Sequence, residues 1–101
     1  MSAVDTEGFL VDPKTWTQQF AMDTAQQYDI ELNDDHWAVI VAVRDFYLKT
    51  GVSPSMRPMV NIVRSIDPNL ASSIVLARMF TSKTSRVVAQ LGGIPKPSDC
   101  L

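Results

Sequence analysis

The stretch from Trp37 to Leu48 constrains the fold most, because it is helical in pattern and almost entirely apolar. Asn33 can cap the start of this helix, and Gly51 suits its end. Within the stretch only Arg44 and Asp45 carry charge. A helix that is apolar on nearly all sides must be surrounded by other elements. The sequence therefore predicts a central helix in a mainly α fold.

Apolar residues at helical spacing predict further helices on both sides of this one. The first begins at Asp12-Pro13, where aspartate can cap free amides and proline fits the first turn. Prolines and glycines separate the later helices. Their apolar positions are Met56, Met59, Val60 and Val63 in one, the run from Leu70 to Phe80 in the next, and Val87, Val88 and Leu91 in the last.

The first dozen residues predict a small β-hairpin. Its turn is placed at Glu7-Gly8, because glycine supplies the positive φ that a tight turn needs. The expected architecture is mainly α (α+β): a compact orthogonal bundle of about five helices with an N-terminal β-hairpin and a flexible C-terminal arm. The central helix, the TGVS turn and the next helix resemble a helix-turn-helix or winged-helix part. We expect the helical domain to span residues 1–91.

Composition excludes several classes of protein. The 101 residues suffice for one domain, and no stretch approaches the roughly 20 apolar residues of a membrane span. The N-terminus lacks the pattern of a secretory signal, so we expect a cytoplasmic protein without membrane contact. The net charge of −2 argues against direct nucleic-acid binding. His36 is the only soft metal ligand besides the one cysteine, so we expect no metal site. The sequence also shows no site for a cofactor, and none is expected.

The last residues, GGIPKPSDCL, place the only cysteine next to the end. Two prolines favour an extended path, and Gly92-Gly93 is expected to act as the hinge of an arm spanning residues 92–101. From the hinge, this arm reaches roughly 25–30 Å. A cytosolic thiol placed there is expected to be functional, so Cys100 is the candidate nucleophile.

The neighbours of Cys100 disfavour its thiolate. Asp99 and the terminal carboxylate both oppose a further negative charge, so a reactive thiolate needs a positive partner. The cationic candidates within the arm's reach are Arg57, Arg86 and Lys96. No Cys–His–Asn hydrolase set can be assembled, because the one histidine lies at the start of the apolar helix, where a structural role is expected.

Three segments carry a resemblance to a known family. DHWAVIVAVRDFYL, SPSMR and GGIPKPSDCL, in this order, resemble the TusE/DsrC family of sulfur-relay proteins, and DTEGF fits the family's opening hairpin. The resemblance implies packed helices and a penultimate cysteine that carries sulfur as a persulfide on a mobile arm. It implies a sulfurtransferase that accepts sulfur from a TusBCD-type donor complex. The acceptor would be a tRNA 2-thiouridylase-type enzyme that thiolates the wobble uridine.

The resemblance also assigns residues and separates two branches of the family. It matches Arg57 to an arginine near the arm and Arg86 to a position that is basic in relatives. The DsrC branch uses a second cysteine where this chain has Ala89, which favours the single-cysteine TusE-like branch. One alternative is a DsrC-like protein of sulfur oxidation or sulfite metabolism. Another is a regulatory DNA-binding member, because Arg57, Asn61 and Arg64 share one helix face.

Overall fold

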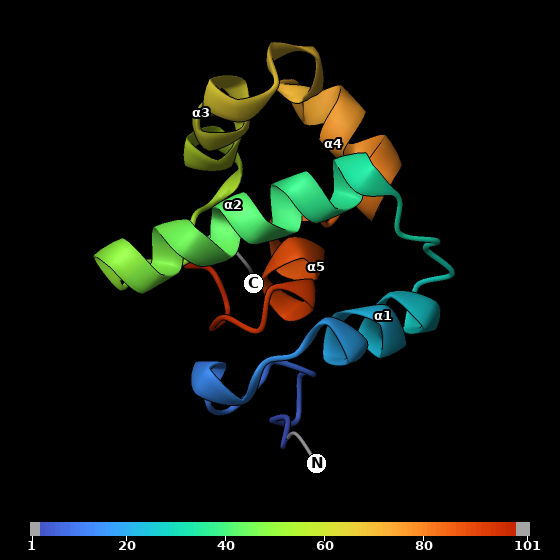
Figure 1. The fold of residues 1–101 in the computed structure, drawn as a ribbon, viewed down its shortest axis with the longest axis vertical. Helices are drawn as coiled ribbons and strands as arrows, with labels where there is room; N and C mark the ends of the chain where they lie inside the picture. Colours follow the sequence, from blue (N-terminus) through green and yellow to red (C-terminus); the bar gives the residue numbers. More distant parts are fainter. Residues whose placement is uncertain (1–2, 99–101) are drawn as a thin grey trace.

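The computed structural model describes residues 3–98 and, within them, five α-helices (Figure 1). The mainly α class is therefore confirmed. The helices are α1 (Gln18–Gln27), α2 (Asp34–Thr50), α3 (Met56–Ile66), α4 (Ser73–Phe80) and α5 (Thr84–Leu91), with short 3₁₀ turns η1 (Pro13–Thr15) and η2 (Pro68–Leu70) between them. None of the helices in this described part is long and apolar enough to cross a bilayer.

The predicted N-terminal β-hairpin is wrong, because the described residues contain no strand. One isolated antiparallel bridge joins Val4 and Leu10. Between them the Asp5 carboxylate accepts hydrogen bonds from the amides of Glu7 and Phe9, which closes a side-chain-capped turn. Phe9 and Leu10 are both buried although they are consecutive, so the segment cannot follow the alternation of a strand. Residues 4–10 therefore form a turn that packs on the core and not a pair of β-strands.

The start of the first helix also differs from the prediction. Asp12 caps the short turn η1 by accepting from the amide of Lys14, and the chain then leaves helical geometry at Trp16. Helix α1 begins after Thr17, whose hydroxyl accepts from the amide of Phe20. The predicted cap at Asp12 is correct, but it serves one turn only. As a result Trp16 lies in the short connection between η1 and α1.

Helix α2 has the ends that the sequence predicts. Asn33 and His36 form a capping box at its start, and Gly51 takes the left-handed conformation at its end. The predicted burial on all sides is wrong, however, because Val41 is 45% exposed and Leu48 is 58% exposed. One face of α2 is therefore open to solvent, and the other packs on α3 and α5.

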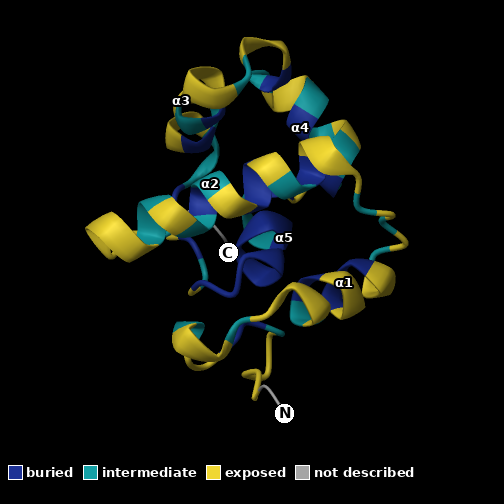
Figure 2. Ribbon diagram, in the orientation of Figure 1, coloured by how far each residue is buried: buried dark blue, intermediate teal, exposed yellow. Residues whose placement is uncertain are grey.

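The centre of the fold is α5. It packs against α1, α2, α3 and α4, and Figure 2 shows it almost uniformly buried. The five residues from Val87 to Leu91 are all buried, including the polar Gln90. Gln90 accepts a hydrogen bond from the Tyr28 hydroxyl and donates one to the carbonyl of Glu7. Because α5 is central, the tail that follows it starts inside the molecule.

Candidate functional site

The tail leaves α5 through a Schellman motif. The amide of Gly93 donates to the carbonyl of Gln90 over 3.2 Å, and the amide of Ile94 donates to the carbonyl of Ala89 over 3.0 Å. Gly93 has a φ of +65°, the left-handed conformation that this motif requires. The side chain of Ile94 is fully buried in the core. The chain up to Ile94 is thus packed as part of the helical body.

Trp16 and Arg44 donate hydrogen bonds to the backbone at the point where the tail leaves α5. The Trp16 indole donates to the carbonyl of Leu91 over 2.8 Å. Arg44 donates to the carbonyls of Gly92 (2.9 Å) and Pro13 (2.8 Å), and its guanidinium lies 4.5 Å from the centre of the Trp16 ring. Burial lowers the pKa of Arg44, but an arginine keeps its proton in proteins. Sequence reasoning missed both residues, although a lone arginine inside an apolar helix was a usable signal.

These contacts bear on the predicted hinge at Gly92-Gly93. Both glycines are buried, and a swing at either one must break the Schellman hydrogen bonds and the bonds from Trp16 and Arg44. Pro95 is the first exposed residue after the helix. The hinge itself stays a prediction, and beyond Pro95 the chain is held again, because Lys96 pairs with Glu7 and Pro97 is buried.

Two of the predicted cationic residues, Arg86 and Lys96, meet at one carboxylate. The Lys96 ammonium lies 3.0 Å from Glu7 Oε1, and an Arg86 guanidinium nitrogen lies 3.6 Å from the same atom. Arg86 also donates to the Glu7 carbonyl over 3.3 Å. The hydrogen bond from Lys96, together with the nearby positive charges, lowers the pKa of Glu7. Sequence reasoning missed Glu7, which joins the N-terminal turn to the tail.

Replacing Glu7 by glutamine is expected to release Lys96 from the N-terminal turn. The folded-state pKa of Glu7 lies below the ordinary glutamate value of 4.5, so the ion pair is fully present at neutral pH. Acidification below 4.5 weakens its contribution, which is lost once the pH falls through the lowered pKa. The amide NMR signals of Lys96 and Ser98 should therefore shift in Glu7→Gln at neutral pH as they do in the wild type on acidification. The matched control, Glu31→Gln, removes another exposed carboxylate and should leave both signals in place. Unmoved signals in Glu7→Gln would show that this contact does not hold the tail.

A hollow of about 260 Å³ lies where the tail passes the end of α2; we call it the tail hollow. It is lined by Tyr47, Gly51, Val52, Ser53, Pro95, Lys96 and Ser98. The Ser53 hydroxyl is buried and has no hydrogen-bond partner among the described residues. Cys100 lies outside the described residues, two positions beyond Ser98. The tail hollow is therefore the described surface nearest in sequence to the thiol.

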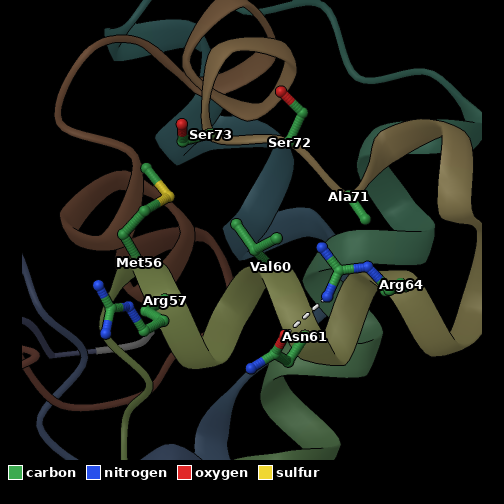
Figure 3. Close-up of a pocket in the computed structure, with 8 residues that line it drawn as sticks. All are labelled: Met56, Arg57, Val60, Asn61, Arg64, Ala71, Ser72 and Ser73. Atoms are coloured by element: carbon green, nitrogen blue, oxygen red, sulfur yellow. Dashed lines mark hydrogen bonds between the residues drawn. The ribbon is translucent and has the colours of Figure 1, made fainter.

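Arg57 lies in a different hollow, which we call the α3–α4 pocket (Figure 3). It has a volume of about 590 Å³ and is lined by Met56, Arg57, Val60, Asn61, Arg64, Ala71, Ser72 and Ser73. The ion pairs between described residues both involve Glu7, so no described carboxylate neutralises Arg57. The structure thus brings Arg86 and Lys96 together and places Arg57 apart from them.

His36 is structural, as predicted. It is buried at the start of α2, where its Nδ1 accepts from the amide of Asn33 and its Nε2 lies 3.0 Å from the carbonyl of Met79. Its ring packs edge-on against Phe80. These contacts tie α2 to the end of α4. Between residues 3 and 98, no three side chains of the metal-binding types lie close enough to hold one ion.

Comparisons with known proteins agree along the whole chain. The family model described as "DsrC like protein" matches residues 1–101. Sulfurtransferase TusE of Buchnera aphidicola subsp. Acyrthosiphon pisum is 38% identical over 98 residues, which cover 96% of this chain and 86% of that protein. The same protein from subsp. Schizaphis graminum is 39% identical with equal coverage. The NMR structure of Allochromatium vinosum DsrC matches with a TM-score of 0.89 at 28% identity, covering 99% of this chain and 90% of that chain.

Proposed function

This chain belongs to the family of DsrC-like proteins, and from that premise we propose that it is a sulfurtransferase that carries sulfur as a persulfide on Cys100. The observation that carries the proposal is the similarity to proteins named sulfurtransferase TusE over 96% of the chain. The lone thiol supports it, because a sulfur carrier needs one nucleophilic sulfur that successive partners can reach.

The proposed transfer proceeds in two exchanges. The Cys100 thiolate attacks the outer sulfur of a donor persulfide, so that a new S–S bond forms while the donor's S–S bond breaks and the donor leaves as a thiolate. An acceptor thiolate then attacks the outer sulfur on Cys100 in the same way, and the Cys100 thiolate is restored. Electrons balance without an external oxidant or reductant.

The absence of a second cysteine fits this carrier role. A nearby thiol would attack the persulfide, release sulfide and close a disulfide. The family resemblance places the second cysteine of the DsrC branch at Ala89, which is buried in α5. The overall similarity to a DsrC structure favours a role in sulfite or sulfur-oxidation metabolism as the second candidate, but the chemistry of one thiol favours relay.

We further propose which residues support the thiol. The contacts of Gly93 and Ile94 support a helical body that ends at Ile94, so the moving arm would begin at Pro95 rather than Gly92, and its movement would release the buried Pro97. Lys96 and Arg86 would stabilise the loaded arm after Lys96 leaves Glu7, because a persulfide is anionic near neutral pH. Arg57 would contact the arm from α3.

The partners proposed for the relay are a TusBCD-type donor complex and a tRNA 2-thiouridylase-type acceptor. This assignment follows the TusE-type resemblance, since the relatives' names state only sulfur transfer. The relay would operate in the cytoplasm, where a lone thiol stays reduced.

Intact-mass analysis tests the proposal. The protein is incubated with a cysteine desulfurase, cysteine and a TusBCD-type donor without reductant. We expect a gain of one sulfur atom's mass that reductant removes, located by peptide mapping on the C-terminal peptide. No gain with a donor that loads a known TusE protein in parallel would overturn the carrier function.

A further inference from the structure

The charges of this chain are divided along its sequence. Residues 1–54 hold nine of the eleven acidic side chains, whereas residues 55–98 hold only one, Asp67. The latter segment holds six of the nine basic side chains: Arg57, Arg64, Arg78, Lys83, Arg86 and Lys96. The expectation against nucleic-acid binding rests on the net charge of −2, which averages over this division. Because Arg86 and Lys96 pair with Glu7, the positive surplus of this segment lies on Arg57, Arg64, Arg78 and Lys83, and local potential decides the partner.

The α3–α4 pocket concentrates part of this charge in a concave site. Figure 3 shows Arg57 and Arg64 at its two ends, with Val60 between them and the serines at the start of α4 opposite. Arg64 donates to Asn61 Oδ1 over 2.8 Å, which fixes its guanidinium on the rim. No acidic side chain lines the pocket. The positive end of the α4 dipole adds to the same potential, because Ser72 is the N-cap of that helix.

The spacing of the two arginines suits a strand with repeated phosphates. They are seven residues apart on α3, which corresponds to about 10 Å along the helix axis. Two guanidiniums at that separation contact different phosphates rather than one. Met56, Val60 and Ala71 supply an apolar surface between them that a ribose or base can cover.

The shape of the pocket favours a single strand over a duplex. A helix that reads duplex DNA must protrude into the major groove. Here the basic face of α3 borders a hollow whose opposite wall is the start of α4, so the duplex backbone would meet that wall first. RNA recognition commonly uses unpaired segments whose bases are turned outward into such hollows.

We propose that the α3–α4 pocket binds the phosphate backbone of a single-stranded segment of RNA. The inference rests on the proposed function, whose acceptor step acts on an RNA uridine. Ser53 lines the tail hollow and Met56 lines the pocket, and because they are three residues apart their Cα atoms lie within about 10 Å of each other. RNA bound in this pocket would therefore lie near the hollow that Pro95, Lys96 and Ser98 of the tail line.

The test is fluorescence anisotropy with a labelled RNA stem-loop that has a uridine-containing single-stranded loop. The chain carries Cys100→Ser, so binding is measured without sulfur chemistry. Arg57→Gln and Arg64→Gln should each weaken binding about fivefold at 0.1 M salt and lower the salt slope by about 0.7, the value for one single-strand phosphate contact. The matched control is Arg78→Gln, which removes an exposed arginine of α4 outside the pocket and should change little.

Three outcomes would overturn the inference: equal losses in Arg78→Gln and the pocket variants, equal affinity for a fully paired RNA duplex of the same length, or equal competition by an acidic peptide. The assay is independent of sulfur loading. RNA binding by a chain that never gains sulfur would retain this inference and remove the carrier function. Sulfur loading without RNA binding would retain the carrier function and remove this inference.

Discussion

Replacing Gly93 by alanine is expected to lower the free energy of unfolding by about 3 kcal/mol and the melting temperature by on the order of 15 °C. Two effects combine. Gly93 has a φ of +65°, which an L-residue with a Cβ adopts at a cost of about 1 kcal/mol or more. A Cβ there would also lie 2.4 Å from Trp16 Cδ1, inside the stacked arrangement of Trp16 on Arg44. Urea unfolding followed by circular dichroism measures the loss.

Gly51→Ala is the matched control for this prediction. Gly51 has a φ of +75°, but a Cβ at this position would have no atom within 4 Å, so only the backbone cost of about 1 kcal/mol applies. The difference between the two variants isolates the contact with Trp16. If both variants lose the same free energy, Trp16 moves aside at no cost and does not hold the exit of the tail.

The sequence predicted those parts of the fold that local chemistry decides. Asn33 and Gly51 bound α2 because caps act within a few residues, and the prediction was correct at both ends. The turn predicted at Glu7-Gly8 forms, with Gly8 at a φ of +89°, but the hairpin failed because Phe9 and Leu10 are both buried and only one bridge, between Val4 and Leu10, joins its sides. From the apolar composition of residues 37–48 we predicted that α2 is the central helix, whereas α5 occupies the centre of the fold. Helix α5 is short and contains polar residues, yet contacts from four helices bury it.

Long-range contacts set the limits of the prediction at the candidate site. Gly92-Gly93 has the composition of a swivel, but its neighbours Trp16 and Arg44 come from distant parts of the chain. Glu7 carried no signal as a tail contact, since its partner Lys96 is 89 residues away. Arg57 was predicted as a cation near the arm, and its place in a pocket with Arg64 became visible only with α4 in position. Residue types were readable from sequence, whereas their partners were not.

Replacing Cys100 by serine is expected to abolish sulfur loading completely. The chain has no other cysteine, and a serine hydroxyl cannot form a persulfide. Intact-mass analysis of the variant after incubation with the donor should show no added sulfur, while thermal unfolding checks that the fold is retained. Added sulfur in the variant that reductant still removes would mean that the chain binds sulfur without its thiol, and the carrier mechanism would fail.

Moving the thiol along the tail tests whether sulfur transfer depends on the position of the thiol as well as on its reactivity. The double variant Cys100→Ser, Ser98→Cys keeps one thiol on the tail but moves it two residues, up to about 7 Å, toward the helical body. Ser98 is exposed, so the relocated thiol should still react with a maleimide. Transfer from the protein donor should nevertheless fall at least about tenfold, because misplacement by a few ångströms removes an aligned attack. Transfer at the wild-type rate would show that partners need only an accessible thiol, and that the arm's length beyond Ser98 has no part in the relay.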